Sequence, residues 1–263
     1  MESGNGWKAG GVSVAGFSHL DADIPCQDAH AYKLEDDGWF IGAVADGAGS
    51  ARLSHIGAEA FINAVLECNL HDLPSKGLDP DGISNALIKI INDTKEELLE
   101  KNKLAEDGTP TSITDFAATL IVVVANHDGG AFFHVGDGSG SAFYLGDIEG
   151  AIVSKPENGE YANETYFVTM KNWETHLRVT TFGGDFDTIL LMSDGVTPMA
   201  MSKGCSQPFD NFVNPVIEFV RNADNATGDA ALINTLSNEK VRSVTGDDKT
   251  LVWAAKPHAN PSD

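Results

Sequence analysis

The feature that most constrains this chain is an apolar run that ends on an acidic residue and then breaks into small residues. The run begins at Phe40, reaches its acid at Asp46 and continues as Gly-Ala-Gly-Ser. An uninterrupted apolar segment of this length, bounded by glycines, predicts a buried β-strand followed by a tight turn. The strand would deliver the carboxylate of Asp46 to the end of a sheet.

Two further strand-like runs end in the same way. Of the seven Asp-Gly dipeptides, the three at Asp46, Asp137 and Asp194 each follow an apolar run. The other four lie in polar surroundings that an ordinary reverse turn explains: Asp37, Asp81, Asp107 and Asp128. Clustered, partly buried carboxylates repel one another unless a cation lies between them, and a hard divalent metal is the usual solution. The repeated pattern therefore predicts a shared metal site.

The charge balance restricts the partners. The chain has 39 acidic and 17 basic residues in 263, a net charge of −22, which argues against nucleic acid and anionic membranes. No segment has the composition of a linker, so we expect one domain over residues 1–256 and a frayed tail over 257–263.

The cysteines and the apolar runs indicate the compartment. Cys26, Cys68 and Cys205 are few, odd in number and far apart, which is typical of a reducing environment. The N-terminus lacks an apolar leader, and the longest apolar run, residues 116–125, is too short to cross a bilayer. These features predict a cytoplasmic protein.

Hydrophobic periodicity predicts strands, two helices, many strands, two helices and a last strand. The expected strands are 11–17, 28–34, 40–45, 116–125, 131–135, 141–145, 151–153, 166–170, 177–182, 189–192 and 250–255. The expected helices are 54–70, with Ser54 as N-cap, 81–106, 209–220 and 229–236. Residues 18–27 are expected to be a loop, and residues 154–165 a loop or a flap. This order is typical of an α+β fold with two sheets and helices outside.

Five acidic positions are candidates for the metal site. Each alone is more often a turn or cap residue. The chain has no zinc-ligand spacing, P-loop, EF-hand or Ser/His/Asp triad, and ligation by oxygen alone matches Mg²⁺ or Mn²⁺. The positions are Asp28, Asp46, Asp137, Asp194 and the pair Asp247-Asp248.

Six short motifs, in this order, resemble those of metal-dependent PP2C-type serine/threonine phosphatases, particularly bacterial ones. They span nearly the whole chain: Gln27-Asp28-Ala29, Val44-Ala45-Asp46-Gly47-Ala48-Gly49, Ala117-Ala118-Thr119-Leu120, His134-Val135-Gly136-Asp137, Ser193-Asp194-Gly195 and Asp247-Asp248-Lys249-Thr250. The resemblance implies a four-layer αββα sandwich, in which two mostly antiparallel sheets are flanked by helix pairs. The metals would lie in a channel at one end.

The resemblance also implies a role for each acid. Asp46 would bridge two metals, the carbonyl of Gly47 would bind one of them, and Asp194 and Asp247 would complete that site. Catalysis would depend on Asp46, Asp194 and Asp247. Asp28 would hold metal-bound water, and Asp137 with Asp194 would bind a third, weaker metal. The cofactors would be two or three Mg²⁺ or Mn²⁺ ions.

The phosphate contact departs from the family pattern. The usual arginine of the first motif has no counterpart, because Asp23 stands near its place; Asp248 replaces an asparagine and Gly138 a serine. We expect His19 and Arg52 to share the missing role, because both lie close in sequence to the acids. The alternative is a loop histidine and a surface arginine, with Arg178 next to test. Arg221 and Arg242 are expected to be solvated surface charges.

The resulting hypothesis is a metal-dependent phosphoprotein phosphatase, in which water bridging two metals attacks phosphoserine or phosphothreonine directly. It would oppose a serine/threonine kinase and act as a monomer, with no nucleic acid or membrane as partner. Two alternatives stay open: a weak or inactive phosphatase-like module that binds metal and phosphoprotein, and a divalent-metal-binding protein without catalysis. Retention of every direct metal ligand favours the enzyme.

Overall fold

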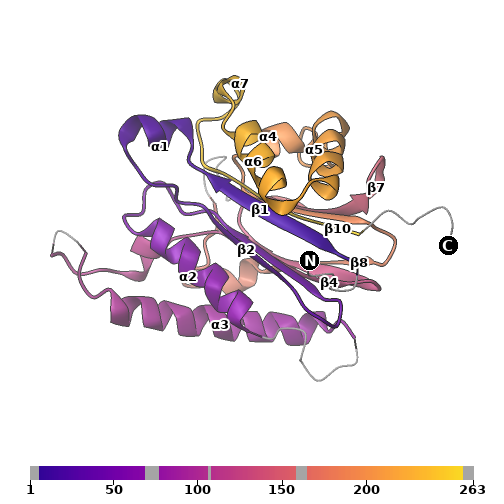
Figure 1. Ribbon diagram of the computed structural model, residues 1–263. Helices are drawn as coiled ribbons and strands as arrows, with labels where there is room; N and C mark the ends of the chain where they lie inside the picture. Colours follow the sequence, from indigo (N-terminus) through magenta and orange to yellow (C-terminus); the bar gives the residue numbers. More distant parts are fainter. Residues whose placement is uncertain (1–5, 69–76, 106–107, 158–164, 257–263) are drawn as a thin grey trace.

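Two antiparallel sheets of five strands each form the centre of the computed structural model, which describes residues 6–68, 77–105, 108–157 and 165–256 (Figure 1). The first sheet has the order β1 Lys8–Val14, β10 Lys249–Ala255, β9 Thr188–Met192, β6 Ser139–Tyr144 and β7 Asp147–Ser154. The second has the order β2 Ala29–Leu34, β3 Phe40–Ala45, β4 Leu120–Asn126, β5 Gly129–Val135 and β8 Arg178–Gly183.

The sheets pack face to face, and their central strands are buried on both sides. In β4, Ile121 and Val123 point into the core between the sheets, whereas Val122 and Val124 point toward the helices outside the second sheet. A strand covered on both faces has no need for alternating polar residues. This explains why its sequence, like that of β3, is continuously apolar.

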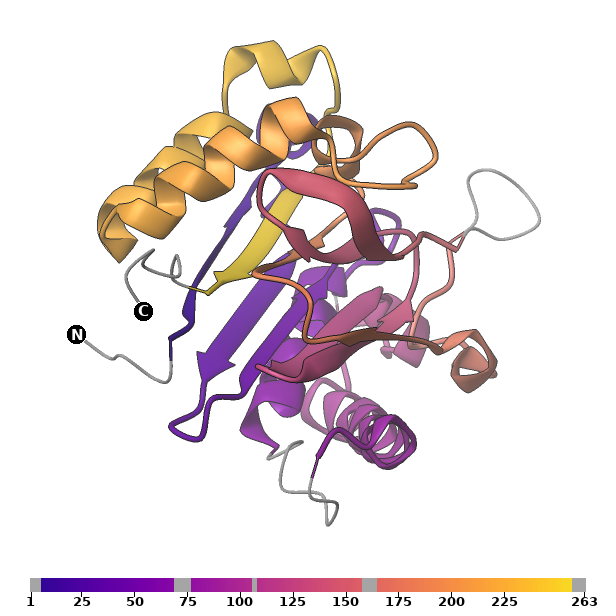
Figure 2. The same ribbon diagram turned by 90° about the vertical axis from the view of Figure 1, so that its right-hand side faces the viewer.

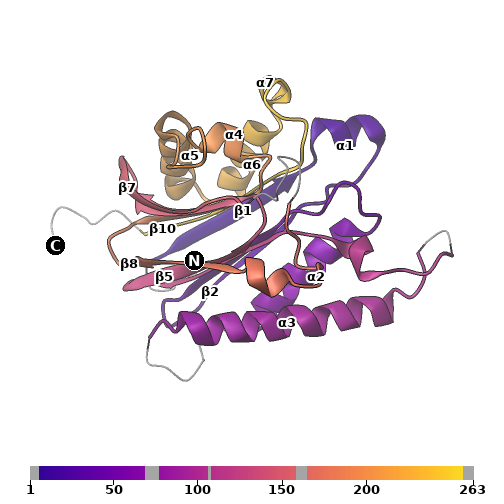
Figure 3. The ribbon, with the colours of Figure 1, turned by 180° about the vertical axis from the view of Figure 1, so that it is seen from behind.

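A pair of helices covers the outer face of each sheet. Helices α2 Ser54–Glu67 and α3 Pro80–Lys101 lie on the second sheet, and α5 Asp210–Asn222 and α6 Asn225–Leu236 lie on the first (Figures 2 and 3). Helix α3 begins after Asp79, whose side chain accepts a hydrogen bond from the amide of Gly82. The expected four-layer α+β sandwich is confirmed.

Several short elements were not predicted from the sequence because each spans fewer than two turns, too little for a periodic pattern. They are α1 Phe17–Ala22, the 3₁₀ helices η1 Ile113–Phe116 and η2 Trp173–His176, α4 Thr197–Ala200 and α7 Glu239–Arg242. The expected loop at residues 18–27 is therefore wrong in its first part. Its helix is fixed by contacts from distant residues: the amide of Ser18 donates to the carbonyl of Gly246.

Three local expectations differ from the structure. Residues 166–170 form no strand; Val168 is fully buried and its amide bonds to the carbonyl of Ala118, so its apolar character reflects core packing by a loop. Leu53, not Ser54, is the N-cap of α2. The run that starts at Phe116 begins on the last residue of η1, and β4 begins only at Leu120.

Some expectations fall outside the described residues. These are the end of the first helix beyond Cys68, the last residue of the second helix, most of the expected flap (158–164) and the tail at 257–263. Among the described residues, none of the helices has both the length and the apolar character needed to span a bilayer.

Candidate metal centre

Three acidic side chains meet at one end of the sandwich. Asp46, Asp137 and Asp194 each offer a carboxylate oxygen, and these atoms all lie within 4.8 Å of one another. Asp46 directly follows β3 of the second sheet, whereas Asp137 and Asp194 lie one residue beyond the ends of β5 of the second sheet and β9 of the first. The group therefore joins both sheets.

Asp28 adds a fourth carboxylate that is almost fully buried. It precedes β2, and the hydroxyl of Ser193 donates to its Oδ2 at 2.7 Å. Its Oδ1, like Oδ1 of Asp194, is buried without a hydrogen-bond partner among the described residues. Buried carboxylate oxygens are normally satisfied. These orphaned atoms, in a donor set made of oxygen, fit a hard divalent cation.

The electrostatics of the group point the same way. Burial, with a further contribution from Asp248, raises the pKa of Asp28 to about 7. Burial and the charges of Asp137 and Asp247 raise the pKa of Asp194 to about 6. Burial and the nearby charges of Asp28, Asp194 and Asp247 raise the pKa of Asp46 well above its ordinary value. These carboxylates are held close together at an electrostatic cost that a cation would offset.

The backbone around Asp46 is held on both sides. Its amide donates to Oγ1 of Thr119 at 3.0 Å, and the amide of Thr119 donates to its carbonyl at 2.8 Å. The amide of Gly47 bonds to the carbonyl of Gln27 at 3.2 Å. A Cβ at Gly47 would lie 2.6 Å from that carbonyl oxygen, so only glycine fits there. The carbonyl of Gly47 thus belongs to a rigid turn.

Asp247 and Asp248 have different surroundings and different roles. The charge of Asp247 acts on Asp46, Asp137 and Asp194, as expected of a member of the acidic group. Asp248 instead binds protein: its carboxylate accepts the amides of Gly16 at 2.6 Å and Gln27 at 2.5 Å.

His19 completes this arrangement, which the sequence analysis missed. Its Nδ1 lies 2.9 Å from Oδ1 of Asp248, giving that carboxylate a third partner. A carboxylate has two acceptor oxygens where an asparagine has one, so the departure at position 248 has a structural reason. The unusual acid at that position was the available signal.

The two expected phosphate ligands both have partners within the protein. His19 contacts Asp248 as described, and Arg52 forms a bidentate pair with Asp115, with Nε–Oδ1 at 3.0 Å and Nη2–Oδ2 at 2.9 Å. Nη1 of Arg52 also donates to Oγ1 of Thr109. Arg52 thus ties the turn after Asp46 to the segment that leads into β4. Its role toward phosphate, and that of His19, stay predictions.

The other arginines differ from expectation in one case. Arg221 is not a solvated surface charge: it is 8% exposed and bonds to the carbonyl of Lys256, with Asp187 at 3.3 Å. Arg242 pairs with Asp21 in an exposed position. Arg178 binds the carbonyl of Gly136, next to Asp137.

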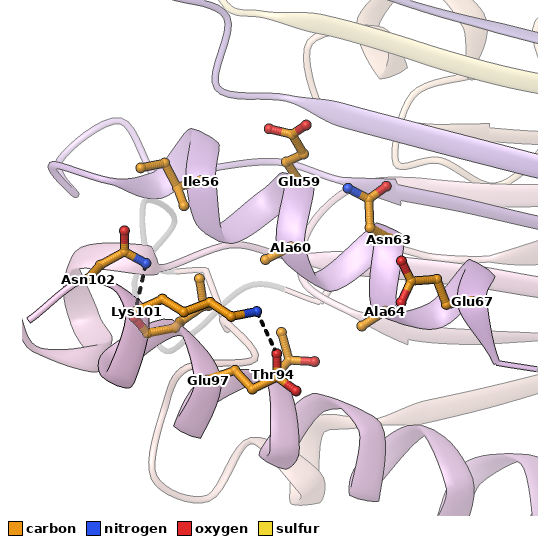
Figure 4. Close-up of a pocket in the computed structure, with 11 residues that line it drawn as sticks. Ile56, Glu59, Ala60, Asn63, Ala64, Glu67, Thr94, Glu97, Lys101 and Asn102 are labelled. Atoms are coloured by element: carbon orange, nitrogen blue, oxygen red, sulfur yellow. Dashed lines mark hydrogen bonds and ion pairs between the residues drawn. The ribbon is translucent and has the colours of Figure 1, made fainter.

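A hollow of about 360 Å³ lies between α2 and α3 (Figure 4). Glu59, Glu67 and Glu97 line it, and Glu97 pairs with Lys101 at 2.8 Å. None of the carboxylates of the metal centre lines this hollow. The acids themselves are packed against one another, so the chemistry and this hollow are separate features.

This chain is similar to known proteins in sequence and in fold. The family model for protein phosphatase 2C matches residues 15–237. Serine/threonine-protein phosphatase 3 of Escherichia coli (strain K12) is 28% identical over 256 residues, covering 94% of this chain and 98% of that protein.

Solved structures share the fold. The serine/threonine phosphatase of S. agalactiae has a TM-score of 0.64 at 15% identity, with 95% of this chain and 100% of that chain covered. The serine/threonine phosphatase Stp1 of Staphylococcus aureus has a TM-score of 0.63 at 17% identity, with 98% of each chain covered. Because the family model covers most of the sequence, this chain belongs to the protein phosphatase 2C family, whose members are metal-dependent phosphatases.

Proposed function

We propose that this protein hydrolyses phosphoserine and phosphothreonine in other proteins with the help of Mg²⁺ or Mn²⁺. The observation that carries the proposal is the meeting of Asp46, Asp137 and Asp194 within 4.8 Å from the ends of three strands. The names of the relatives support the substrate class. Every acid of the expected metal site is present in the chain, which favours an enzyme over a module that only binds.

The residues that would hold the metals follow from the site. Asp46, the carbonyl of Gly47, Asp194 and Asp247 would hold two cations, and Asp137 with Asp194 a third. When bound, such cations lower the pKa of a water molecule and neutralise the phosphoryl oxygens, so that water can attack phosphorus directly.

Asp28 contributes through its own hydrogen bonds. The amide of Thr250 donates to Oγ of Ser193, and that hydroxyl donates to Oδ2 of Asp28. This chain of bonds fixes the carboxylate and leaves Oδ1 as an acceptor that can orient the attacking water. Direct attack by water needs no covalent intermediate on the protein.

The composition of the chain supports a compartment and a set of partners for the enzyme. We place the enzyme in the cytoplasm, since Cys26, Cys68 and Cys205 are all free thiols. It would act as a monomer, with one phosphatase domain over residues 1–256, and oppose a serine/threonine kinase. Its acidic surface does not suit nucleic acid or anionic membranes.

The first prediction concerns the bridging acid. Asp46→Asn should abolish hydrolysis of p-nitrophenyl phosphate in Mn²⁺ and leave the fold intact, because the amide removes a charged ligand and also a repulsive charge. Asp128→Asn is the matched control: it changes another Asp-Gly pair, in an exposed turn between β4 and β5, and should keep full activity. Undiminished turnover of the native enzyme in EDTA, or a trapped phosphoenzyme, would reject the mechanism.

The second prediction concerns pH. The pKa of Asp28 is raised from 3.8 to about 7 and that of Asp194 to about 6, so between these limits the folded protein binds more protons than the unfolded chain. The contribution of these two carboxyl groups to the free energy of unfolding of the metal-free protein is therefore fully present below their unfolded pKa and is lost as pH rises through about 6 and 7. Divalent cations bind the deprotonated carboxylates, so their stabilising effect should grow over the same range.

Thermal unfolding in EDTA and in Mn²⁺ across this pH range tests the second prediction. The gap between the two midpoints should widen with pH. A gap that stays constant or narrows would show that these carboxylates do not bind the cation.

The third prediction concerns phosphate binding. If His19 and Arg52 contact the phosphate, His19→Ala and Arg52→Ala should each raise KM for a phosphopeptide. Asp115→Asn distinguishes the structural role of Arg52 from a role in phosphate binding, because it weakens the ion pair between residues 52 and 115 and keeps the guanidinium of Arg52. Native KM in both alanine variants and in the double variant would remove these residues from the site.

A further inference from the structure

Arg178 of β8 is bonded to the segment that carries Asp137. Its Nη2 donates to the carbonyl of Gly136 at 2.9 Å, and its Nη1 donates to the carbonyl of Lys155. Its Nε lies 3.2 Å from Oε2 of Glu157, and the side chain is 29% exposed. One guanidinium thus joins the turn after β5 to the segment that leaves β7.

The Gly136-Asp137 turn receives further bonds from that same connection. The amide of Glu157 donates to the carbonyl of Gly136 at 2.9 Å, so this oxygen accepts two hydrogen bonds. On the far side of the connection, Oγ1 of Thr165 donates to Oδ2 of Asp137 itself. Residues before and after the expected flap therefore both contact this turn.

Gly136 also links Asp137 to the bridging acid. Its φ of +117° lies in the region that favours glycine, and a Cβ there would meet the side chain of Thr119 at 2.5 Å. Thr119 in turn bonds to the amide and carbonyl of Asp46. A shift of the Gly136 carbonyl would therefore change where Asp137 stands relative to Asp46.

We propose that Arg178 is a positioning residue that holds Asp137 in place for the third, weaker metal. This inference rests on the proposed function, and it gives Arg178 a different role from that of the next phosphate ligand to test. Its Nη1 and Nη2 already donate to two carbonyls from different segments. The two Nη atoms of a planar guanidinium hold their donors apart in fixed directions, whereas an ammonium carries its donors on one atom at the end of a flexible stem.

The test compares Arg178→Lys with the same substitution at a matched arginine elsewhere in the protein. Arg221 also bonds to a backbone carbonyl and contacts a carboxylate, but its partners Lys256 and Asp187 lie at the other ends of β10 and β9 from Asp247 and Asp194. Arg221→Lys therefore makes the same chemical change away from the metal centre. Calorimetric titration of each variant with Mn²⁺ reads out the sites without relying on turnover.

The expected result is selective. In the native protein, Asp137→Ala should remove a weak Mn²⁺ site and leave two tighter ones. Arg178→Lys should weaken that same site by about tenfold, a typical effect of losing support behind a ligand. It should leave the affinity of the tighter sites unchanged. Combined with Asp137→Ala, it should cause no further loss of Mn²⁺ binding. Arg221→Lys should titrate as the native protein does.

Three results would overturn the inference: no weak site that Asp137→Ala removes, a native weak site in Arg178→Lys, or equal weakening of all sites in that variant. If Arg178→Lys does not unfold cooperatively, Arg178→Gln takes its place, since it keeps an amide donor without the charge. A native protein that binds Mn²⁺ but does not hydrolyse p-nitrophenyl phosphate would contradict the proposed function alone, and the titration would still decide the role of Arg178.

Discussion

The mutual repulsion of buried carboxylates at one end of the sandwich is the constraint on which the rest of the structure depends. Asp28, Asp46 and Asp194 all have pKa values raised by burial and by the charges of neighbouring acids. Each raised unit of pKa corresponds to about 1.4 kcal/mol between the two protonation states. A fold that keeps these groups together without a cation loses stability, so their arrangement makes sense as a site for divalent metals.

The surrounding structure is built to hold these side chains against that repulsion. Strands from both sheets end at the same place, and Thr119 bonds to the backbone of Asp46 on both sides. Asp248 gathers the amides of Gly16 and Gln27 with the ring of His19. The loops thus approach closely enough for the acids to share a cation.

Prediction from the sequence succeeded for the features that follow from patterns along the chain. Continuous apolar runs such as β3 and β4 identified strands covered on both faces, and the Asp-Gly pattern picked out the three acids that meet. It failed where contacts between distant residues decide the structure. Helix α1 is too short to be periodic and is held by Gly246, while Val168 is apolar because its loop packs into the core. The partners of Arg52 and Arg221 likewise depend on tertiary contacts that spacing does not show.

The most direct test of the account is anomalous diffraction at the manganese edge from crystals grown with Mn²⁺. The account predicts two strong peaks bridged by the carboxylate of Asp46, one of them also in contact with Asp194 and Asp247. Manganese bound only at exposed carboxylates, such as Glu59 and Glu67 of the hollow between α2 and α3, with none at Asp46, would contradict it.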